Sequence, residues 1–547
     1  MTEARSHRRD LVLATLLGAV LFLPGLGARD LWNPDEPRYA EIAREMREAG
    51  DLPHFVVPRL NGEIYAQKPP LLFWLMCLGA AIAGQLNETV VRLPLALSAA
   101  LTLPLLLEIG RTWLTRRASW IAVGVFGTCV NVMLQARAAQ IDMLLVLLVT
   151  LAMREWVRWL ETSQRAHAWA GFAAAGLATL AKGPVGLLPP LLALATFLVV
   201  SGQRERLRDR GLWVGLLVWA AVVLAWLVPA ALLGGASYRH SILFQQNFER
   251  FADPSGHLRP WYYYLQVLPI TFFPWSFLVP SATVLGFRRL EGRRRRGFLF
   301  ALCWVVVTLV FFSLSPGKRT VYMLTMYPGL ALLISAGVDP LCDAPASDRR
   351  WLGIPLGLLA LPLALGAVAA LALPRFADRL PEIGVLGPDL AIRTALTVGA
   401  LALGAAVALG LVAFRRPRAA FVALAAGSGI AGLLAALVLL PPFDAIKSAR
   451  GLATVYRQRA GPDEPFGIFP RLDPPFLFYT ERFATVLRSA DELRAFAARP
   501  GRVWVFAEER FLRNVEPPVG LVEVARDADP RSGYVLLATR PLAPPGD

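Results

Sequence analysis

Residues 116–158 have the sequence RRASWIAVGVFGTCVNVMLQARAAQIDMLLVLLVTLAMREWVR, and this stretch contains the organising pattern of the chain. Two apolar runs flank the short polar turn RAAQID at 137–142, and each is close to the ~20 residues that a helix needs to cross a membrane. Arginines lie at both far ends, in the stretches 111–117 and 154–165. Because cytoplasmic connections carry an excess of Lys and Arg, the pattern predicts a helical hairpin whose turn faces the outer side.

The composition of the whole chain is typical of a membrane protein. Of its 547 residues, 56% are hydrophobic and 18% are charged, and the mean hydropathy is +0.50. An ordinary soluble protein has about 25% charged residues. The 4 cysteines (Cys77, Cys129, Cys303 and Cys342) lie in or beside apolar runs, which excludes a secreted disulfide scaffold. The 15 Trp and 29 Phe exclude a disordered chain.

Similar apolar runs recur along the first 441 residues, and thirteen of them are long enough to be predicted as membrane spans. These spans are 10–27, 90–110, 118–135, 142–158, 166–181, 184–201, 211–233, 264–287, 297–314, 320–337, 351–373, 391–414 and 418–441. The fold class predicted is therefore a mostly α, polytopic membrane protein with about 13 transmembrane helices.

Arginine-rich stretches between these spans predict the topology. They lie at 5–9, 111–117, 154–165, 204–210, 288–296, 349–350 and 415–418. Placing all of them in the cytoplasm puts the N-terminus inside and residues 442–547 outside. The net charge of +16 then follows from membrane topology, and no nucleic-acid partner is predicted.

Two apolar runs need a separate interpretation. The topology holds only if residues 71–84 do not cross, so we interpret this run as an interfacial or re-entrant helix on the outer side. The alternative is a plain transmembrane hairpin over 71–110. No small-residue cleavage site follows the N-terminal run, which we interpret as a retained first span rather than a signal peptide.

The C-terminal region has a different pattern. Short apolar runs at 466–469, 476–480, 502–507 and 533–539 are typical of strands. Between them, a capping-box sequence at 489–492 predicts the start of a helix that runs to about Ala498. The predicted domains are a transmembrane domain over 1–441, with large outer loops at 28–89 and 234–263, and a small periplasmic α/β domain over 442–547.

The first outer loop contains adjacent carboxylates in the sequence LWNPDEPRYAE at 31–41. Pro37 suits a first helical turn and Asp35 the N-cap, and the apolar positions that start at Tyr39 predict an amphipathic helix on the membrane surface. Asp35 and Glu36 are then either a simple cap and a solvated acid, or acids that act as a base or metal ligand for a membrane substrate.

Three further charged residues lie at outer ends of the predicted spans. Lys68, before two prolines, either extends its ammonium to the membrane surface or contacts a phosphate. Asp142 either caps its helix or belongs to a site, because an acid at this depth needs a partner. Lys182 is interpreted as part of a tight helical turn.

The second large loop and a late turn add more candidate ligands. In residues 247–264, Arg250, His257 and Arg259 are candidates for phosphate binding, and His257 also for a metal, whereas the neighbouring Trp and Tyr residues are interpreted as an interfacial belt. In the turn 313–322, Lys318, Arg319 and Tyr322 lie on the outer side, where an anionic head group would explain the cations.

These residues together fit transfer of a group from a lipid-linked phosphate. A leaving phosphate is a stable anion and needs cations and hydrogen-bond donors, for which Lys68, Arg250 or Arg259, Lys318 and Tyr322 are the candidates. A carboxylate, Asp35 first and Asp142 second, would orient or deprotonate the acceptor. Glu36 is a third candidate acid, and Arg38 and Tyr39 are further candidates for contacts to the substrate.

With these residues considered, the sequence resembles the lipid-carrier-dependent glycosyltransferases of the C-type fold, which include protein O-mannosyltransferases and bacterial aminoarabinose transferases acting on lipid A. The matching stretches are LWNPDEPRYAEIAREM at 31–46, KPP at 68–70, RAAQID at 137–142, LAKGPVG at 180–186, NFERF with HLRPWYYY in 247–264, and FFSLSPGKRTVYMLTMYPGLALL at 311–333. The resemblance implies that Asp35 is catalytic, that Asp142 matches a second loop acid, and that Lys68 and Tyr322 contact the carrier phosphate.

One position departs from the resemblance. In lipid A aminoarabinose transferases the residue before the equivalent of Lys68 is typically Glu and helps to hold a metal, whereas this chain has Gln67. A neutral amide is a poor metal ligand. Either no divalent metal is bound, or His257 and another group hold it.

We therefore predict a bacterial inner-membrane glycosyltransferase that uses a polyprenyl-phosphate sugar at its periplasmic face. Aminoarabinose transfer to lipid A, with inversion at the anomeric carbon, is the leading specific hypothesis. The same reaction with a protein hydroxyl or another envelope glycan as acceptor is the nearest alternative. A transporter or flippase for a lipid-linked substrate is a rival of another class, but it would place ionisable residues near the membrane midplane, whereas here they collect at outer span ends.

Overall fold

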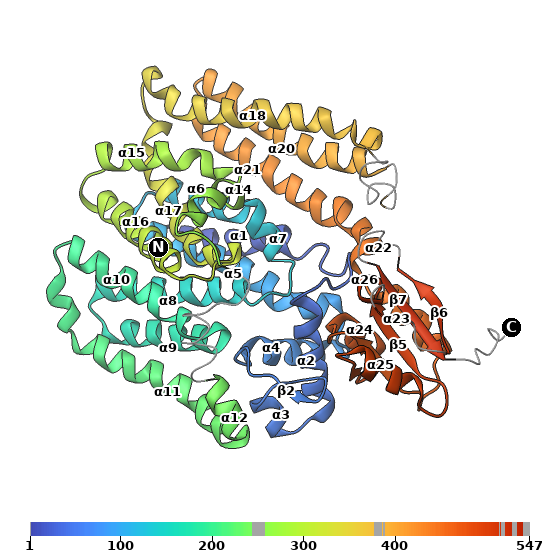
Figure 1. The fold of residues 1–547 in the computed structure, drawn as a ribbon. Helices are drawn as coiled ribbons and strands as arrows, with labels where there is room; N and C mark the ends of the chain where they lie inside the picture. The colour runs from blue at the N-terminus through green and yellow to red at the C-terminus, as the bar shows by residue number, and fades with distance from the viewer. Residues whose placement is uncertain are drawn as a thin grey trace.

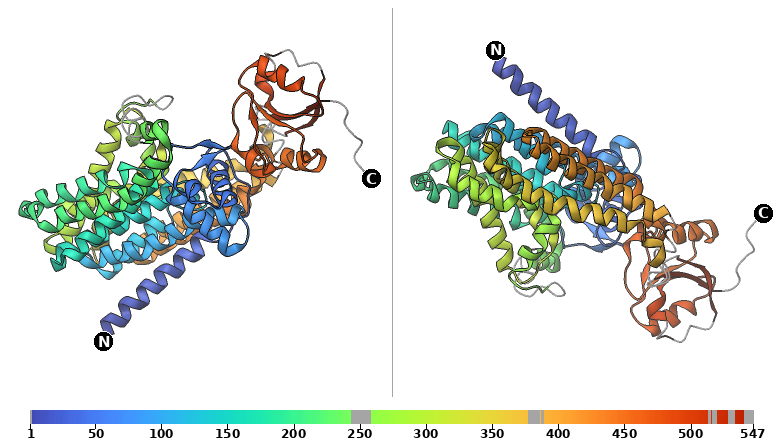
Figure 2. Two further views of the ribbon diagram at one scale, coloured as in Figure 1. Left: turned by 90° about the horizontal axis from the view of Figure 1, so that it is seen from below. Right: turned by 90° about the horizontal axis from the view of Figure 1, so that it is seen from above.

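The computed structural model describes residues 2–242, 258–376, 389–512, 520–527 and 533–539, and the single residues 386 and 515. Most of these residues form a bundle of helices, and a small sheet built from C-terminal residues lies at one end of the bundle (Figures 1 and 2). A mostly helical membrane protein with a small sheet region is therefore confirmed.

Each of the thirteen predicted spans is helical over most of its length. The helices are α1 (Thr2–Phe22), α5 (Glu88–Trp113), α6 (Arg116–Gly127) with α7 (Val130–Gln135), α8 (Asp142–Thr162), α9 (Arg165–Lys182), α10 (Leu188–Val200), α11 (Arg210–Leu233), α14 (Tyr263–Thr271) with α15 (Val279–Arg289), α16 (Gly292–Leu314), η5 (Thr320–Met326) with α17 (Tyr327–Val338), α18 (Arg350–Ala370), α20 (Asp389–Ala413) and α21 (Pro417–Leu434).

The described residues contain 7 helices that are individually long and apolar enough to cross a membrane, or 8 if the bent pair α14 and α15 counts as one span. The remaining predicted spans correspond to shorter, broken or more polar helices. The count of thirteen stays a prediction.

Two of the broken helices meet inside the bundle. Helices α6 and α7 are interrupted at Thr128, and α14 is bent by 112° against the helical segment that begins at Trp275. The backbone N–H of Val130 donates to the carbonyl of Phe273 (3.0 Å), and the indole of Trp275 donates to the hydroxyl of Thr128 (3.2 Å). Non-helical backbone in an apolar interior needs such partners. Polar groups at one break therefore form hydrogen bonds with polar groups at the other.

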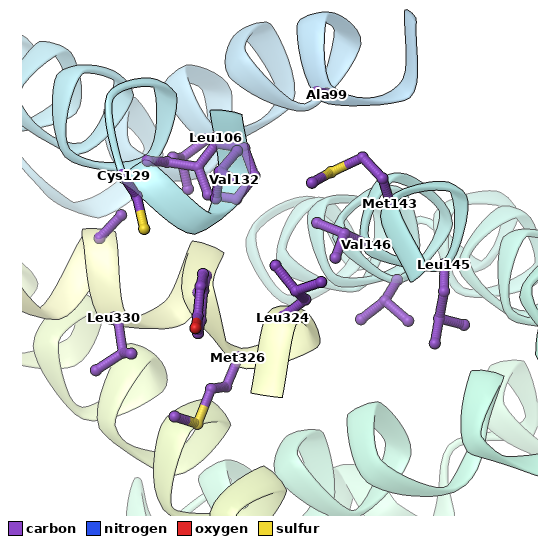
Figure 3. Packing of buried hydrophobic residues seen from close by; sticks show 14 of the residues in the cluster. Ala99, Leu106, Cys129, Val132, Met143, Leu145, Val146, Leu324, Met326 and Leu330 are labelled. Carbon is purple, nitrogen blue, oxygen red and sulfur yellow. The ribbon is translucent and has the colours of Figure 1, made fainter. Parts of the chain in front are cut away.

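Large apolar side chains fill the space around these breaks. Figure 3 shows Leu106 of α5, Val132 of α7, Val146 of α8 and Leu324 of η5 gathered in this core. All four are buried. This packing fixes the outer ends of α7 and α8, and therefore the turn 136–141 between them.

The first outer loop folds into α2 (Glu36–Ala49), α3 (Leu52–Val56), a hairpin of β1 (Arg59–Leu60) and β2 (Glu63–Ile64), and α4 (Leu71–Ala83). Helix α4 has 13 residues, or about 20 Å, which is shorter than the ~30 Å hydrocarbon core. Its length agrees with the interpretation that this run stays on one side of the membrane.

The expectation that α2 lies on the membrane surface is wrong. Its polar side is buried as well as its apolar side: Glu41, Arg44 and Glu45 are all largely covered. Helix α2 packs between α4 and α24 (Pro474–Thr480), a helix of the C-terminal region. The polar side of α2 faces other parts of the protein: Glu45 accepts from the backbone N–H groups of Asn61 and Gly62, and the Arg44 guanidinium lies 5.9 Å from the centroid of the Phe483 ring.

The C-terminal sheet has the strand order β4-β3-β5-β7-β6. Strand β3 (Phe466–Phe469) is parallel to β4 (Thr485–Val486) and β5 (Trp504–Glu508), whereas β7 (Tyr534–Thr539) is antiparallel to β5 and β6 (Leu521–Arg526). The strands predicted at 466–469, 502–507 and 533–539 are thus confirmed.

The two remaining predictions for this region have opposite outcomes. The helix predicted from the capping box is confirmed as α25 (Ala490–Ala497), and the Ser489 side chain accepts from the Glu492 N–H. The strand predicted at 476–480 is wrong, because these residues form α24. A short apolar run that is buried on all sides has no diagnostic period, and Pro474 and Pro475 suit a first helical turn.

The C-terminal region also holds the segment that leads into α2. Figure 1 shows α24 beside α2. Three consecutive residues of the first loop bond to this region: the Leu31 N–H to the Tyr479 hydroxyl (2.8 Å), the Trp32 indole to Asp444 (2.7 Å), and the Asn33 amide to Asp473 (2.8 Å). These three hydrogen bonds therefore hold the segment before α2 against the C-terminal region.

Candidate active site

Asp35 lies at the N-cap of α2, but its side chain makes no capping hydrogen bond. It lies instead 3.5 Å from the guanidinium of Arg38 and 3.3 Å from that of Arg319, which follows α16 in the late turn. The residue is only 7% exposed. These contacts are longer than the ~2.8 Å of a tight ion pair. Asp35 is therefore a buried but loosely held anion, and the alternative that it only caps a helix is wrong.

Asp142 is the second acid of the site. It is buried at the first turn of α8, and it forms an ion pair with Lys182 at the end of α9. The Lys182 ammonium also lies 4.7 Å from the centroid of the Tyr322 ring, within the range of a cation–π interaction. Lys182 is therefore more than part of a helical turn, because it joins the second acid to the late-turn phenol.

Tyr39 is buried in the first turns of α2, four residues after Asp35. Its burial is the largest cause that raises its pKa well above the ordinary value, and the charges of Tyr65, Asp35 and Asp142 raise this pKa further. The first loop and the turn before α8 meet beside Tyr39, because the Ala139 N–H donates to the Glu36 carboxylate (2.9 Å).

The pKa of Arg319 is also affected by Asp35 and Asp142. Burial lowers its pKa, but the charges of Asp35, Tyr322 and Asp142 outweigh this effect and raise the pKa. The described part of the site thus combines two carboxylates, three cations and two phenols: Asp35, Asp142, Arg38, Lys182, Arg319, Tyr39 and Tyr322. It is strongly charged and partly closed to water.

Lys318 has a different position from the one predicted. It is 4% exposed, and its ammonium donates to the carbonyls of Ser315 and Arg259. Leu258 and Gly317 also pair as an isolated bridge, so Lys318 ties the end of the second large loop to the late turn. The neighbouring residue, Arg319, is the cation that reaches Asp35.

The other predicted phosphate ligands are only partly placed. Lys68 is half-buried in the connection before α4, three residues after Tyr65, whose ring lies 6.3 Å from that of Phe73. Arg259 is exposed. Arg250 and His257 lie outside the described residues. The roles of Lys68, Arg250, Arg259 and His257 stay predictions.

Glu36, adjacent to Asp35, is in a very different environment. It is 3% exposed and accepts hydrogen bonds from Arg29 (2.6 Å), Arg92 (2.8 and 3.1 Å) and the backbone N–H groups of Trp32 and Ala139. Burial alone would raise its pKa, but the charges and hydrogen bonds of Arg92 and Arg29 outweigh burial and lower the pKa to about 2. Both oxygens are occupied, so Glu36 supports the site and is not available to a substrate.

The partners of Glu36 were not identified from the sequence. Arg92 is fully buried near the start of α5, where it also donates to the carbonyls of Leu26, Arg29 and Asp30. An arginine inside a predicted span is costly unless it has partners, and this is the signal that could have identified it.

The described residues do not fit a metal site. No group of three or more His, Cys, Asp or Glu side chains in the described ranges could hold a metal ion. Asp35 and Asp142 are already paired with Arg38, Arg319 and Lys182. Gln67 is exposed.

Comparison with solved structures identifies the fold. ArnT from Cupriavidus metallidurans, in its structure bound to undecaprenyl phosphate, superposes with a TM-score of 0.83 over 98% of this chain and 99% of that protein, at 23% identity. The archaeal oligosaccharyltransferase AglB from Archaeoglobus fulgidus is more distant, with a TM-score of 0.53 at 13% identity over 93% of this chain and 70% of that protein. This chain therefore shares the fold of these two membrane proteins.

Sequence comparison is more specific. The family described as dolichyl-phosphate-mannose-protein mannosyltransferase matches residues 67–228. The undecaprenyl phosphate-alpha-4-amino-4-deoxy-L-arabinose arabinosyl transferase of Pectobacterium carotovorum subsp. carotovorum is 33% identical over 384 residues, which are 69% of this chain and 65% of that protein. Its counterpart in Pseudomonas aeruginosa is 32% identical over 67% of this chain and 66% of that protein. The similarity thus spans about two thirds of these relatives, and the resemblance expected from the motifs is confirmed.

We expect Glu36→Gln to destabilise the protein, because it leaves Arg29 and Arg92 buried with a neutral partner. Breaking a buried ion pair in this way costs about 3–5 kcal/mol. Since the folded pKa of Glu36 is lowered from 4.5 to about 2, its stabilisation is present above pH 4.5 and lost as the pH falls toward 2. Thermal unfolding of the purified protein at several pH values measures both effects.

The matched control is Glu48→Gln on the same helix, because the Glu48 side chain is 55% exposed and pairs with Arg44 at the surface. It should leave the unfolding midpoint almost unchanged. Equal midpoints for the two variants would show that Glu36 does not support the fold.

Proposed function

We propose that this chain is a glycosyltransferase that moves a sugar from a polyprenyl phosphate to an acceptor at the outer face of the membrane. The observation that carries the proposal is the position of Asp35, loosely held between Arg38 and Arg319 beside the Asp142–Lys182 pair. Such a site offers a carboxylate to an acceptor and cations to a phosphate within the same small volume.

The cations would act on the leaving group. In the reaction, the acceptor oxygen bonds to the anomeric carbon while the bond from that carbon to the carrier phosphate oxygen breaks, and the phosphate leaves with the electron pair. Arg319 and Lys182 would stabilise this negative charge, with Tyr322 as a hydrogen-bond donor and Lys68 as a further cation. A single displacement of this kind inverts the anomeric carbon.

Asp35 would act on the acceptor. If the acceptor is a hydroxyl, its proton passes to the Asp35 carboxylate as the new bond forms. If the acceptor is a phosphate, almost no proton removal is needed, and the carboxylate orients it or stabilises positive charge at the sugar carbon. Because the contacts to Arg38 and Arg319 are long, the substrate can compete for these cations without breaking a tight ion pair.

For the substrates, we propose 4-amino-4-deoxy-L-arabinose on undecaprenyl phosphate as donor and lipid A as acceptor. The names of the similar arabinosyl transferases support this choice. A protein hydroxyl is the second candidate acceptor, because the family that matches residues 67–228 is described as a protein mannosyltransferase. The proposal places the enzyme in a bacterial inner membrane, with the N-terminus in the cytoplasm and a C-terminal domain over 442–547 in the periplasm.

The direct test is to incubate the purified full-length protein with the prenyl-phosphate aminoarabinose donor and either lipid A or a hydroxyl-bearing acceptor peptide. Mass spectrometry should detect aminoarabinose on lipid A. If only the peptide is modified, a protein hydroxyl rather than lipid A is the acceptor. Transfer to neither would contradict the proposed function.

In this assay, we expect Asp35→Asn to reduce transfer by about 10²–10⁴-fold, because it removes the group that orients or deprotonates the acceptor. The unfolding midpoint should stay close to that of the wild type. Asp51→Asn is the matched control in the same loop, since Asp51 is exposed and contacts His54. Near-normal turnover by the Asp35 variant would remove Asp35 from the mechanism.

Lys182→Gln and Lys318→Gln should separate phosphate binding from loop structure. We expect the first to weaken binding of a polyprenyl phosphate about tenfold or more, because it removes a charge-assisted contact. The second should lower the unfolding midpoint but leave the affinity nearly unchanged, because Lys318 contacts backbone carbonyls. Calorimetric titration and thermal unfolding of both variants make the comparison. If Lys318→Gln weakens binding and Lys182→Gln lowers only the unfolding midpoint, then Lys318 binds the phosphate and Lys182 has the structural role.

We also propose that the chain's own cations replace a divalent metal. Arg38, Arg319 and Lys182 already outnumber the two acids they contact. Treatment with a strong chelator should therefore leave transfer within about twofold of the untreated rate. Loss of activity that zinc or another divalent ion restores would contradict this proposal and return a ligand role to His257.

A further inference from the structure

Basic residues from three separate predicted cytoplasmic stretches line one cavity at the far end of α8 from Asp142: His7 from the first, Arg111 from the second, and Arg154 and Arg158 from the third. The cavity has a volume of about 360 Å³ and lies between α1, α5 and α8. Its charged lining residues are His7, Glu108, Arg111, Arg154 and Arg158. The stretches 5–9, 111–117 and 154–165, which are far apart in the sequence, therefore meet at one place.

The cations of this cavity outnumber its acids. Arg111 and Arg116 share Asp10, at 2.5 and 2.6 Å. Arg154 pairs with Glu108 at 2.8 Å and also with Glu155, which His167 approaches to 2.7 Å, and His7 lies 3.8 Å from the Glu108 carboxylate. Each acid is thus shared by more than one basic group.

Arg158 provides positive charge that no acid balances. It is exposed at the edge of the cavity, and within the described ranges it contacts no carboxylate. Arg8 and Arg9, next to His7 on α1, are exposed as well. An anion that enters the cavity would therefore find guanidinium donors that are not fully used by the protein.

We propose that this cavity binds the phosphate head group of an anionic phospholipid. Basic pockets between helices at the cytoplasmic ends of spans suit such head groups. A lipid is favoured over a soluble phosphate because α1 continues from the cavity into an exposed apolar surface that includes Val12, Leu13 and Leu16. Figure 2 shows α1 at the edge of the bundle with its N-terminal end projecting, so this surface is open to acyl chains.

The charge of the cavity also predicts which lipids it accepts. A phosphatidylglycerol head group carries a net negative charge, which guanidinium groups bind by charge-assisted hydrogen bonds. A phosphatidylcholine head group carries the same phosphate and an ammonium group, which the surplus positive charge disfavours. The site should therefore select anionic lipids.

This site is separate from the proposed active site. Asp142 begins α8 and Arg158 lies sixteen residues further along the same helix, a distance of about 24 Å. Changes at Arg158 can therefore be tested without disturbing Asp35, Lys182 or Tyr322, and the result does not depend on the proposed transfer reaction.

The test is native mass spectrometry of the delipidated full-length protein in detergent, titrated with phosphatidylglycerol, phosphatidylcholine or inorganic phosphate. We expect phosphatidylglycerol to bind more tightly than phosphatidylcholine. Arg158→Ala should weaken the phosphatidylglycerol adduct about fivefold, since one basic residue near a lipid surface contributes about that factor. Arg208→Ala, at an exposed arginine in another cytoplasmic connection, is the matched control and should bind as the wild type does.

The relative binding of the two lipids to the wild type and to the two arginine variants tests the proposed lipid site. Tighter binding of phosphatidylglycerol that is lost in the Arg158 variant and kept in the Arg208 variant supports it. Equal binding of the two lipids, or equal loss in both variants, overturns it. Displacement of the lipid by inorganic phosphate at comparable concentration would also overturn it, because the occupant would then be a soluble anion.

Discussion

The buried carboxylate of Glu36 is the interaction on which the site depends. One of its oxygens accepts from Arg92 of the first long span and from the backbone of Ala139, and the other accepts from Arg29 and Trp32. Asp35 is the next residue toward the N-terminus, and Asp142 follows Ala139 by three positions. Since a buried charge must be fully compensated, neither loop can move away without exposing an uncompensated ion. The buried carboxylate of Glu36 therefore fixes the distance between Asp35 and Asp142.

The C-terminal region extends this constraint beyond the membrane helices. Trp32 and Asn33, just before Asp35, are held by Asp444 and Asp473, and α24 packs against α2. The Arg450 guanidinium adds ion pairs to Asp30 and to Glu88. Among the described residues of the sheet, none is an acid or cation in contact with Asp35. Its structural contribution is to keep the first loop folded at the end of the bundle, where water would otherwise compete for every one of these hydrogen bonds.

The sequence predicted the helices well because their signal is local. A long run of apolar residues between arginines is typical of a membrane-spanning helix, and each of the predicted spans is helical over most of its length. It predicted the surroundings of α2 poorly, because the covering helix α24 follows more than 400 residues later. The strand expected at 476–480 failed for a related reason: a run buried on every side carries no period that distinguishes strand from helix.

The candidate site shows the same limit at the level of single residues. Asp35, Asp142 and Tyr322 were predicted from their motifs. Lys318 was predicted as the phosphate-stabilising cation in place of Arg319, because adjacent cations in a turn differ only in the direction of their side chains, which the sequence does not show. In the structure, one contacts backbone carbonyls and the other Asp35. Likewise, Asp35 and Glu36 are adjacent acids with opposite environments. Glu36 is saturated by close partners, whereas the contacts of Asp35 to Arg38 and Arg319 are 3.5 and 3.3 Å long, and this difference is the reason that Asp35 rather than Glu36 is proposed to act on the acceptor.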